Sequence, residues 1–261
     1  MTTCGGVCPN ALPKPADATQ CQALAEQAVA EFGQLDILIN NAGILRDKTL
    51  LKLSDEMWDP VIDVHLKGSF LCMQAADAAV MVVDAVDGVK VQTEQVSEYA
   101  NEFQQPCLIF INKLDREGLP PLDILDEIEN KLQIECTPLS WPIGMGKSFK
   151  GVYNLFRREL HLFEPGRETV GQPGVVIRDL ADPMLDDLLG SQAKELRGDI
   201  ELLEGAVDPF EMTHFLNGSQ TPVFFGSAIN NFGVKELLDG FVELAPAPGP
   251  RTTTSRQVVP E

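Results

Sequence analysis

The chain has 261 residues, of which 44% are hydrophobic, and its formal net charge is −19. This size can enclose one large hydrophobic core or two modest ones. No apolar run approaches the roughly 18 residues of a membrane-spanning helix, and an acidic chain without a basic stripe is not expected to bind DNA directly. The N-terminus lacks the features of a secretory signal, and six scattered cysteines fit a reducing compartment, so a cytoplasmic location is expected.

The first part of the chain predicts two helices around a short buried strand. An apolar pattern with helical spacing covers residues 21–33 and ends in glycine. The segment LDILIN, residues 35–40, has the length and composition of a strand. A second helical pattern covers residues 55–76, with Ser54 as its N-cap.

From residue 78 onward, apolar strands and amphipathic helices alternate, which is typical of a mostly parallel sheet. Strands are predicted at residues 78–85, 107–112 and 222–228. Helices are predicted at residues 91–105 and 234–244. Residues 138–221 are less regular and include a charged helix at 184–203, so they predict an inserted α+β subdomain. The fold class is therefore α/β, a three-layer Rossmann-like and P-loop-GTPase-like hybrid whose sheet is flanked by helices.

Both ends of the chain are expected to lie outside the folded parts. Residues 1–14 predict a disordered leader, and its Cys4 and Cys8 have no second ligand pair nearby, so no metal site is predicted. The proline-rich residues 246–261 predict a linker.

Residues 15–76 resemble a short-chain dehydrogenase. The sequence Asn40-Asn41-Ala42-Gly43 after the strand LDILIN matches the NNAG turn of that family, and Asp17 stands where the family often has an adenine-contacting aspartate. The resemblance implies an NAD(P) cleft lined by Asp17, Asn40, Ala42 and Gly43.

The catalytic residues of that family are missing here. Its proton transfer uses a Tyr-x-x-x-Lys pair, but the tyrosines of this chain, Tyr99 and Tyr153, have no lysine four residues on. The glycine-rich turn for the pyrophosphate is absent, and His65 replaces the usual helix asparagine. Hydride transfer by this chain alone is therefore not expected.

Residues 77–245 resemble a translational GTPase, most closely the family of bacterial peptide chain release factor 3. The matching stretches are DAAVMVVDAVDGVKVQTEQV from residue 77, LIFINKLDREG from residue 108, WPIGMGKSFKGVYNLF from residue 141 and FFGSAINNFGV from residue 224. The resemblance implies GTP or GDP as ligand, and the ribosome and release factors as partners in translation termination.

The resemblance also implies which residues read the guanine base. Asp115 would accept hydrogen bonds from guanine N1 and the exocyclic amine, which adenine cannot supply in that geometry. Asn112 would tie the loop to neighbouring segments, and the stem of Lys113 would cover one face of the base. The backbone amides of Ser227 and Ala228 would meet the guanine O6.

Two segments superficially match a phosphate-binding loop, and neither is predicted to be one. Gly144 to Ser148 reads GMGKS, but Trp141 occupies the position of the first glycine and no long helix follows. In residues 41–49, Asp47 replaces the glycine that lets amides wrap a phosphate. Magnesium-binding switch residues are not recognisable either, so nucleotide binding would be weak, hydrolysis is not expected, and no catalytic residue is assigned.

The two resemblances meet near residue 76, which predicts one hybrid sheet in the strand order 35–40, 78–85, 107–112 and 222–228. Three functions stay open: a truncated GTPase module, a dehydrogenase-derived NAD(P)-binding remnant, and a rearranged gene product without selected activity.

Overall fold

The computed structural model describes residues 54, 59, 78–102, 105–163, 175–177, 179–246, 251–252 and 257–258. The predicted helix at 21–33, the strand at 35–40 and the segment 41–49 lie outside these residues, as does the predicted helix at 55–76 except for residue 59. So do the following predicted or discussed residues: Cys4, Cys8, Asp17, Asn40, Ala42, Gly43 and His65. Residues Val80–Glu94 and Pro106–Leu244 form one compact unit, which is described here by itself.

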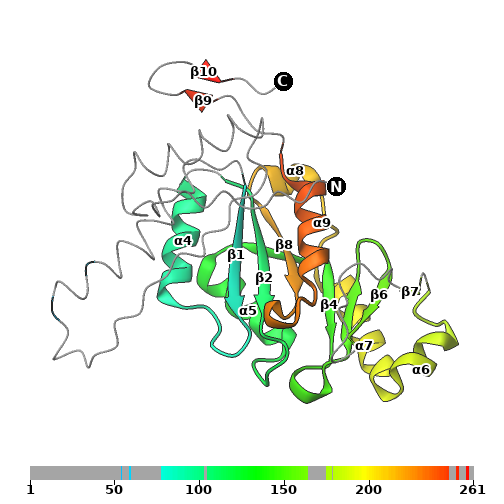
Figure 1. The fold of residues 1–261 in the computed structure, drawn as a ribbon. Coiled ribbons are helices and arrows are strands. Elements are labelled where there is room, and N and C mark those ends of the chain that lie inside the picture. Colours follow the sequence, from blue (N-terminus) through cyan, green and yellow to red (C-terminus); the bar gives the residue numbers. More distant parts are fainter. Residues whose placement is uncertain are drawn as a thin grey trace, which may run out of the picture. The chain divides into compact units, whose positions relative to one another are not determined.

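The centre of this unit is a four-stranded sheet in the order β1-β2-β8-β3 (Figure 1). Its strands are β1 (Ala79–Asp84), β2 (Cys107–Asn112), β8 (Gln220–Phe225) and β3 (Glu135–Pro138). Strand β8 pairs in parallel with both β2 and β3. The neighbours β1, β2 and β8 confirm the order predicted for these three strands, whereas β3 was not predicted.

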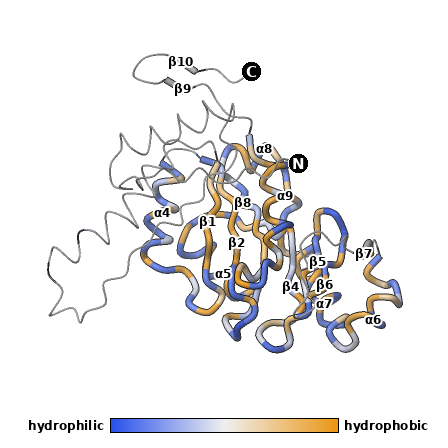
Figure 2. Tube along the Cα trace, in the orientation of Figure 1, coloured by the Kyte–Doolittle hydropathy of each residue, from blue (hydrophilic) through white to orange (hydrophobic). Residues whose placement is uncertain are grey.

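The two middle strands are continuous apolar runs because parallel strands are covered on both faces. Leu108 to Ile111 of β2 and Val223 to Phe225 of β8 are all buried. In Figure 2 the central strands are orange along much of their length, which marks them as hydrophobic. A covered sheet of this kind leaves its strand ends, rather than its faces, to contact a ligand.

Three helices continue the alternation of strands and helices: α4 (Val91–Glu102), α5 (Pro121–Leu132) and α9 (Val234–Leu244). Helix α5 starts with a proline, which is tolerated in the first turn because the backbone N–H that proline lacks would have no partner within the helix there. The helix buries an apolar stripe centred on Ile124 and Ile128. Helix α9 packs closely on β8, since a side chain at Gly240 would overlap the ring of Phe224. Among the described residues, no helix is long and apolar enough to cross a bilayer.

Between β3 and β8 the chain forms a second, antiparallel sheet in the order β4-β5-β6-β7. Its strands are β4 (Ser140–Ile143), β5 (Gly151–Asn154), β6 (Glu159–Leu162) and β7 (Val175–Val176). The helices α6 (Pro183–Leu189), α7 (Ser191–Ala206) and α8 (Met212–Leu216) follow (Figure 1). This is the inserted α+β subdomain that the sequence predicts.

The single charged helix predicted at 184–203 is wrong, because α6 and α7 are separate helices. Gly190 between them has φ 63° and ψ −128°, which is a backbone conformation essentially restricted to glycine. The chain therefore turns at Gly190 although the helical pattern continues through it.

Strand β4 attaches the insert to the central sheet. The ring of Trp141 meets Phe225 of β8 edge-to-face, with centroids 5.3 Å apart, and its indole N–H donates to Asp199 of α7 at 3.0 Å. The backbone N–H of Phe225 donates to the hydroxyl of Ser140 at 2.9 Å. The insert thus holds β8 near its carboxyl end.

The last described elements are β9 (Arg251–Thr252) and β10 (Gln257–Val258), which pair antiparallel with each other.

Candidate nucleotide-binding site

Two loops with polar side chains begin where β2 and β8 end. Strand β2 ends at Asn112 and β8 ends at Phe225, and the two strands are parallel neighbours, so both loops leave the same edge of the sheet. The backbone N–H of Ala85, directly after β1, donates to the carbonyl of Asn112 at 2.9 Å, which brings a third strand end to this edge. The carboxyl edge of a parallel sheet is where α/β proteins bind their ligands.

The side chain of Asn112 joins the two loops. Its Oδ1 accepts hydrogen bonds from the backbone N–H of Lys113 and from that of Ala228, both at 2.8 Å. Lys113 has φ 71°, a left-handed conformation that is uncommon outside glycine. Asn112 therefore stabilises an unusual turn and ties it to the second loop.

The second link between the loops is formed by Asp115 and Ser227. The Ser227 hydroxyl is fully buried and donates to Oδ1 of Asp115 at 2.6 Å, while the Asn230 amide donates to the same hydroxyl at 2.9 Å. The other carboxylate oxygen of Asp115, Oδ2, has no hydrogen-bond partner among the residues described. The Asp115 side chain is partly exposed and is thus oriented by Ser227 while still able to accept from a ligand.

Lys113 is held by an acidic residue from the neighbouring strand. Its ammonium group forms an ion pair with Asp84, the last residue of β1. Burial raises the pKa of the Asp84 carboxyl. The hydrogen bonds from Lys113 and from the Val86 N–H together lower it by more, so the pKa lies below its ordinary value. Asp84 is therefore ionised at neutral pH and fixes the end of the Lys113 side chain.

The loop after β8 is closed by backbone contacts. Gly226 donates to the carbonyl of Ile111 at 2.9 Å and accepts from the Leu114 N–H at 3.2 Å. Ser227 and Phe232 exchange two backbone hydrogen bonds of 2.8 and 3.0 Å. A side chain at Gly226 would overlap the Phe232 carbonyl and the Phe110 ring, so glycine is required for this close approach.

The structure thus brings together all five predicted base-reading residues, but the two predicted amide donors are engaged within the protein. Ser227 N–H donates to Phe232, and Ala228 N–H donates to Asn112. A guanine O6 would therefore have to share or replace the Asn112 oxygen as partner of the Ala228 amide. Asp84, Asn230 and Phe232 were missed by sequence reasoning. Asp84 could have been found from the sequence, because it is an acidic residue at the end of a predicted strand.

GMGKS has the geometry of a hairpin connection. Gly144 and Gly146 have φ values of 72° and 57°, a short 3-10 helix (η3, Gly146–Ser148) follows, and the flanking strands β4 and β5 are antiparallel. The Gly146 N–H, which a phosphate loop would offer to its ligand, donates instead to the Leu114 carbonyl at 2.8 Å. This segment is therefore not a strand-to-helix phosphate loop, as its sequence context predicts.

The parallel sheet and its linked strand-end loops define an α/β domain with a candidate ligand site at the carboxyl edge of the sheet. The family model for the elongation factor Tu GTP binding domain matches residues 68–247. Because this match covers well over half of the sequence, the chain belongs to that family.

A second family model, short chain dehydrogenase, matches residues 12–98 and overlaps the first over residues 68–98. Among solved structures, a protein from Thermus thermophilus matches with a TM-score of 0.51 at 22% sequence identity. The match covers 70% of this chain and 29% of the Thermus chain, so this chain spans less than a third of that protein's length. At this identity the similarity supports the fold alone.

Proposed function

We propose that this chain is a guanine-nucleotide-binding module related to peptide chain release factor 3, and that it does not hydrolyse GTP by itself. The observation that carries the proposal is the double link between the loops, Ser227 to Asp115 and Ala228 to Asn112, at the carboxyl edge of the sheet. The ribosome and release factors are its proposed partners in translation termination.

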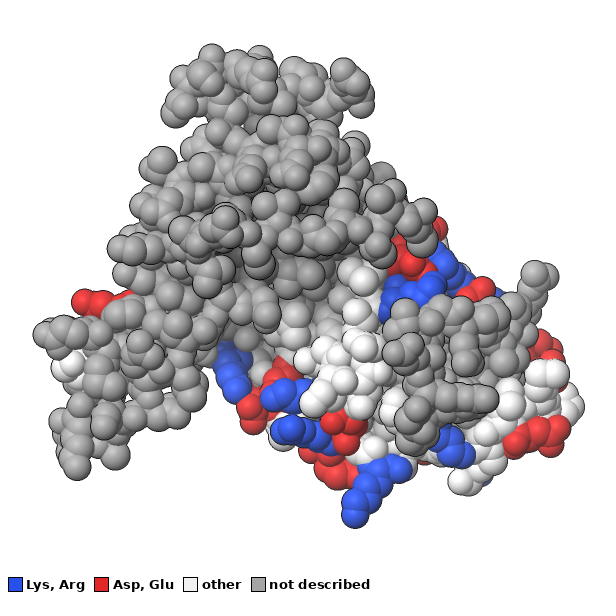
Figure 3. All heavy atoms as spheres, viewed as in Figure 1, with Lys and Arg blue, Asp and Glu red and all other residues white. Residues whose placement is uncertain are grey.

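The chemistry of this edge suits guanine. Guanine presents two adjacent N–H donors, N1 and the exocyclic amine, and a carboxylate such as Asp115 can accept from both. Adenine has neither the N1 hydrogen nor an amine at C2, so it would leave the carboxylate unpaired on this edge, which costs roughly 1–3 kcal/mol for each bond not made. On the face that Figure 3 shows, Lys/Arg and Asp/Glu lie interspersed over the coloured atoms, so this part of the described surface carries no broad basic patch for nonspecific binding.

Loss of hydrolysis is proposed because neither segment that resembles a phosphate loop suits a phosphate. GMGKS forms a hairpin connection, and Asp47 stands where the other candidate, residues 41–49, would need glycine. Without charge-assisted hydrogen bonds to the phosphates, each worth about 1.5–3 kcal/mol, binding would depend on the base.

Titration calorimetry with GDP, GTP and NADH tests the proposal. We expect GDP to bind and Asp115→Ala to abolish this binding, while Asp126→Ala, an exposed aspartate of α5, leaves it unchanged. GDP binding that survives Asp115→Ala would contradict the assignment of the base site.

A second candidate is an NAD(P)-binding remnant, favoured by the short chain dehydrogenase match at residues 12–98. Binding of NADH but not GDP, lost on substitution of Asp17 or Gly43, would support it. A cooperative thermal transition without binding of any of the three ligands would instead support a rearranged product that folds without this activity.

A further inference from the structure

The loop between β4 and β5, residues 144–150, contacts both base-reading loops. It comprises GMGKS, Phe149 and Lys150, and is called the β4–β5 loop below. Its sequence resembles a phosphate loop, and neither base reading nor the packing of the insert's own core explains its contacts with the two loops.

Its first half holds the loop that carries Asp115. The Gly146 N–H donates to the Leu114 carbonyl at 2.8 Å, and the Met145 sulfur accepts from the Gly118 N–H at 3.2 Å. These contacts lie on both sides of Asp115 in the sequence. The backbone that carries the carboxylate is therefore held at two points by one turn of the insert.

Phe149 of this loop holds the loop that carries Ser227. The Phe149 ring packs edge-to-face on Phe232 with centroids 5.3 Å apart, and Phe163, just after β6, completes a cluster of three rings at 5.4 Å from Phe232. Phe149 and Phe232 are 9% and 4% exposed, so this is a buried contact. Phe232 in turn exchanges both backbone hydrogen bonds with Ser227.

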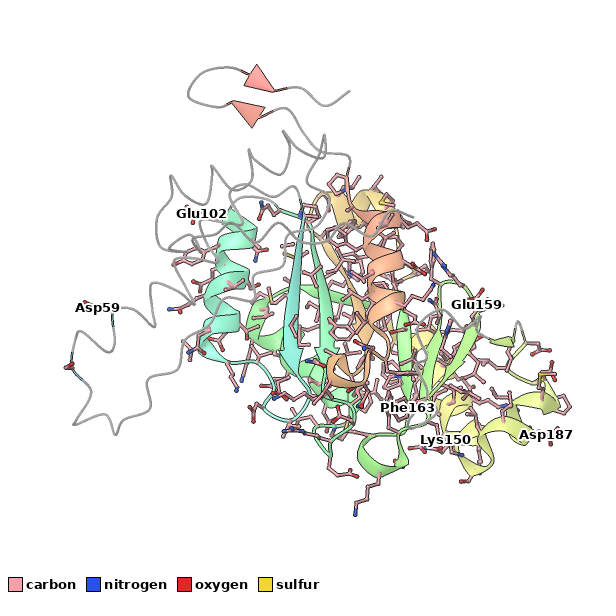
Figure 4. All side chains as sticks on the ribbon, in the orientation of Figure 1. Asp59, Glu102, Lys150, Glu159, Phe163 and Asp187 are labelled. Carbon is pink, nitrogen blue, oxygen red and sulfur yellow. The ribbon has the colours of Figure 1, made fainter. Side chains whose placement is uncertain are left out.

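The β4–β5 loop is itself anchored from behind by the helices of the insert. The Ser148 carbonyl accepts from the Gln192 side chain at 2.9 Å, and the Lys150 ammonium donates to the Leu189 carbonyl at the end of α6 at 2.7 Å. Figure 4 shows Phe163 and Lys150 at the same end of the second sheet, away from Glu159 at the other end of β6. The loop is thus a fixed support.

We propose that the β4–β5 loop positions the two base-reading loops relative to each other, with Phe149 as the positioning residue for Ser227 and, through it, for Asp115. The inference rests on the proposed guanine site, but its structural part can be tested without a ligand. Asp115 depends on the Ser227 hydroxyl for its orientation, so displacement of Phe232 loosens the carboxylate that selects guanine.

Amide hydrogen exchange of the ligand-free protein is the first test, with Phe149→Ala compared to Phe156→Ala. Phe156 is a matched control because it is half-exposed and contacts Phe210 of the insert. We expect about tenfold faster exchange at Phe232, Ser227 and Leu114 in Phe149→Ala, with β2 and β5 unchanged. Unchanged exchange in the loops, or a uniform increase through β2 and β5, would overturn the proposal. Phe149→Leu serves the same comparison if Phe149→Ala does not fold.

The second test is the ratio of affinities for GDP and inosine diphosphate, which lacks the exocyclic amine. Phe149→Ala should reduce the preference for GDP about fivefold or more, because the amine contributes only when Asp115 is oriented. A preserved ratio with weaker binding of both ligands would argue against positioning. If the unaltered protein binds neither ligand, the proposed function fails, and hydrogen exchange alone decides the role of Phe149.

Discussion

Asn112 and Asp115 read as parts of one motif in the sequence, but they stabilise the site in different ways. Asn112 uses its side-chain oxygen to hold two backbone amides, which is a structural task. Asp115 uses one oxygen for Ser227 and presents the rest of its carboxylate outward. The role of Asn112 in tying its loop to a neighbouring segment could be anticipated from motif resemblance, whereas the bond between Asp115 and Ser227 could not. Nor could the dependence of Lys113 on Asp84, because these residues are 29 positions apart.

At Lys113 we predict a measurable change in the titration of its partner. In Lys113→Met the pKa of Asp84 should rise, because burial still raises it while the largest lowering contribution is removed. Carboxyl NMR titration of both proteins measures this shift.

Lys235→Met is the matched control, since Lys235 forms its ion pair with Asp239 on α9. An Asp84 pKa that does not move in Lys113→Met, or that moves equally in the control, would show that the ion pair is not formed in solution.

At the scale of elements, the division between α6 and α7 depends on one backbone conformation. A side chain at Gly190 meets nothing within 4 Å, so Gly190→Ala adds only backbone strain, of order 1–3 kcal/mol. Gly198 lies exposed within α7 and its added Cβ also meets nothing, so Gly198→Ala should stabilise the protein by roughly 0.5–1 kcal/mol. Urea denaturation should give these opposite signs, and destabilisation of similar size in both variants would be inconsistent with this explanation.

A second link between elements is the contact of His161 on β6 with Glu236 on α9, with 3.0 Å between Nδ1 and Oε1. Burial lowers the pKa of His161. The interactions with Glu236 and Glu159 raise it by more, so the pKa lies above its ordinary value. Burial raises the pKa of Glu236, but His161 outweighs this and lowers it. The pair therefore joins the insert to α9 most strongly when both groups are charged.

The pH dependence follows from these directions. The His161 contribution is complete below its unfolded pKa, about 6.5, and is lost as the pH rises through the raised folded value. The Glu236 contribution is complete above its unfolded pKa, about 4.3, and is lost as the pH falls through the lowered folded value. We expect His161→Gln to cost about 1–2 kcal/mol near pH 5.5 and less at alkaline pH.

Urea denaturation across pH checks this expectation, with His214→Gln as control because His214 is half-exposed on α8. A cost for His161→Gln that does not vary with pH would mean that the pair contributes packing rather than charge.

At the scale of the whole molecule, the α/β class and the order of β1, β2 and β8 could be predicted because fully buried parallel strands leave continuous apolar runs. Strand β3 escaped prediction since ECTP is short, ends in proline and has few apolar residues. The insert was expected from its irregular composition, but its antiparallel pairing was not. Its strands β4 to β7 are short, so they leave no extended apolar pattern in the sequence, although β4 with β5 and β5 with β6 pair as local hairpins.

The sequence by itself determined the residue types at the strand ends and the family to which they belong, since motifs preserve the local chemistry of a site. Tertiary structure decided how they are connected. It made GMGKS a turn against Leu114, used the Ala228 amide for Asn112, and placed Phe149 on Phe232. The physical reason is that hydrogen bonds and ring contacts depend on distances between segments, which local patterns of residues do not encode.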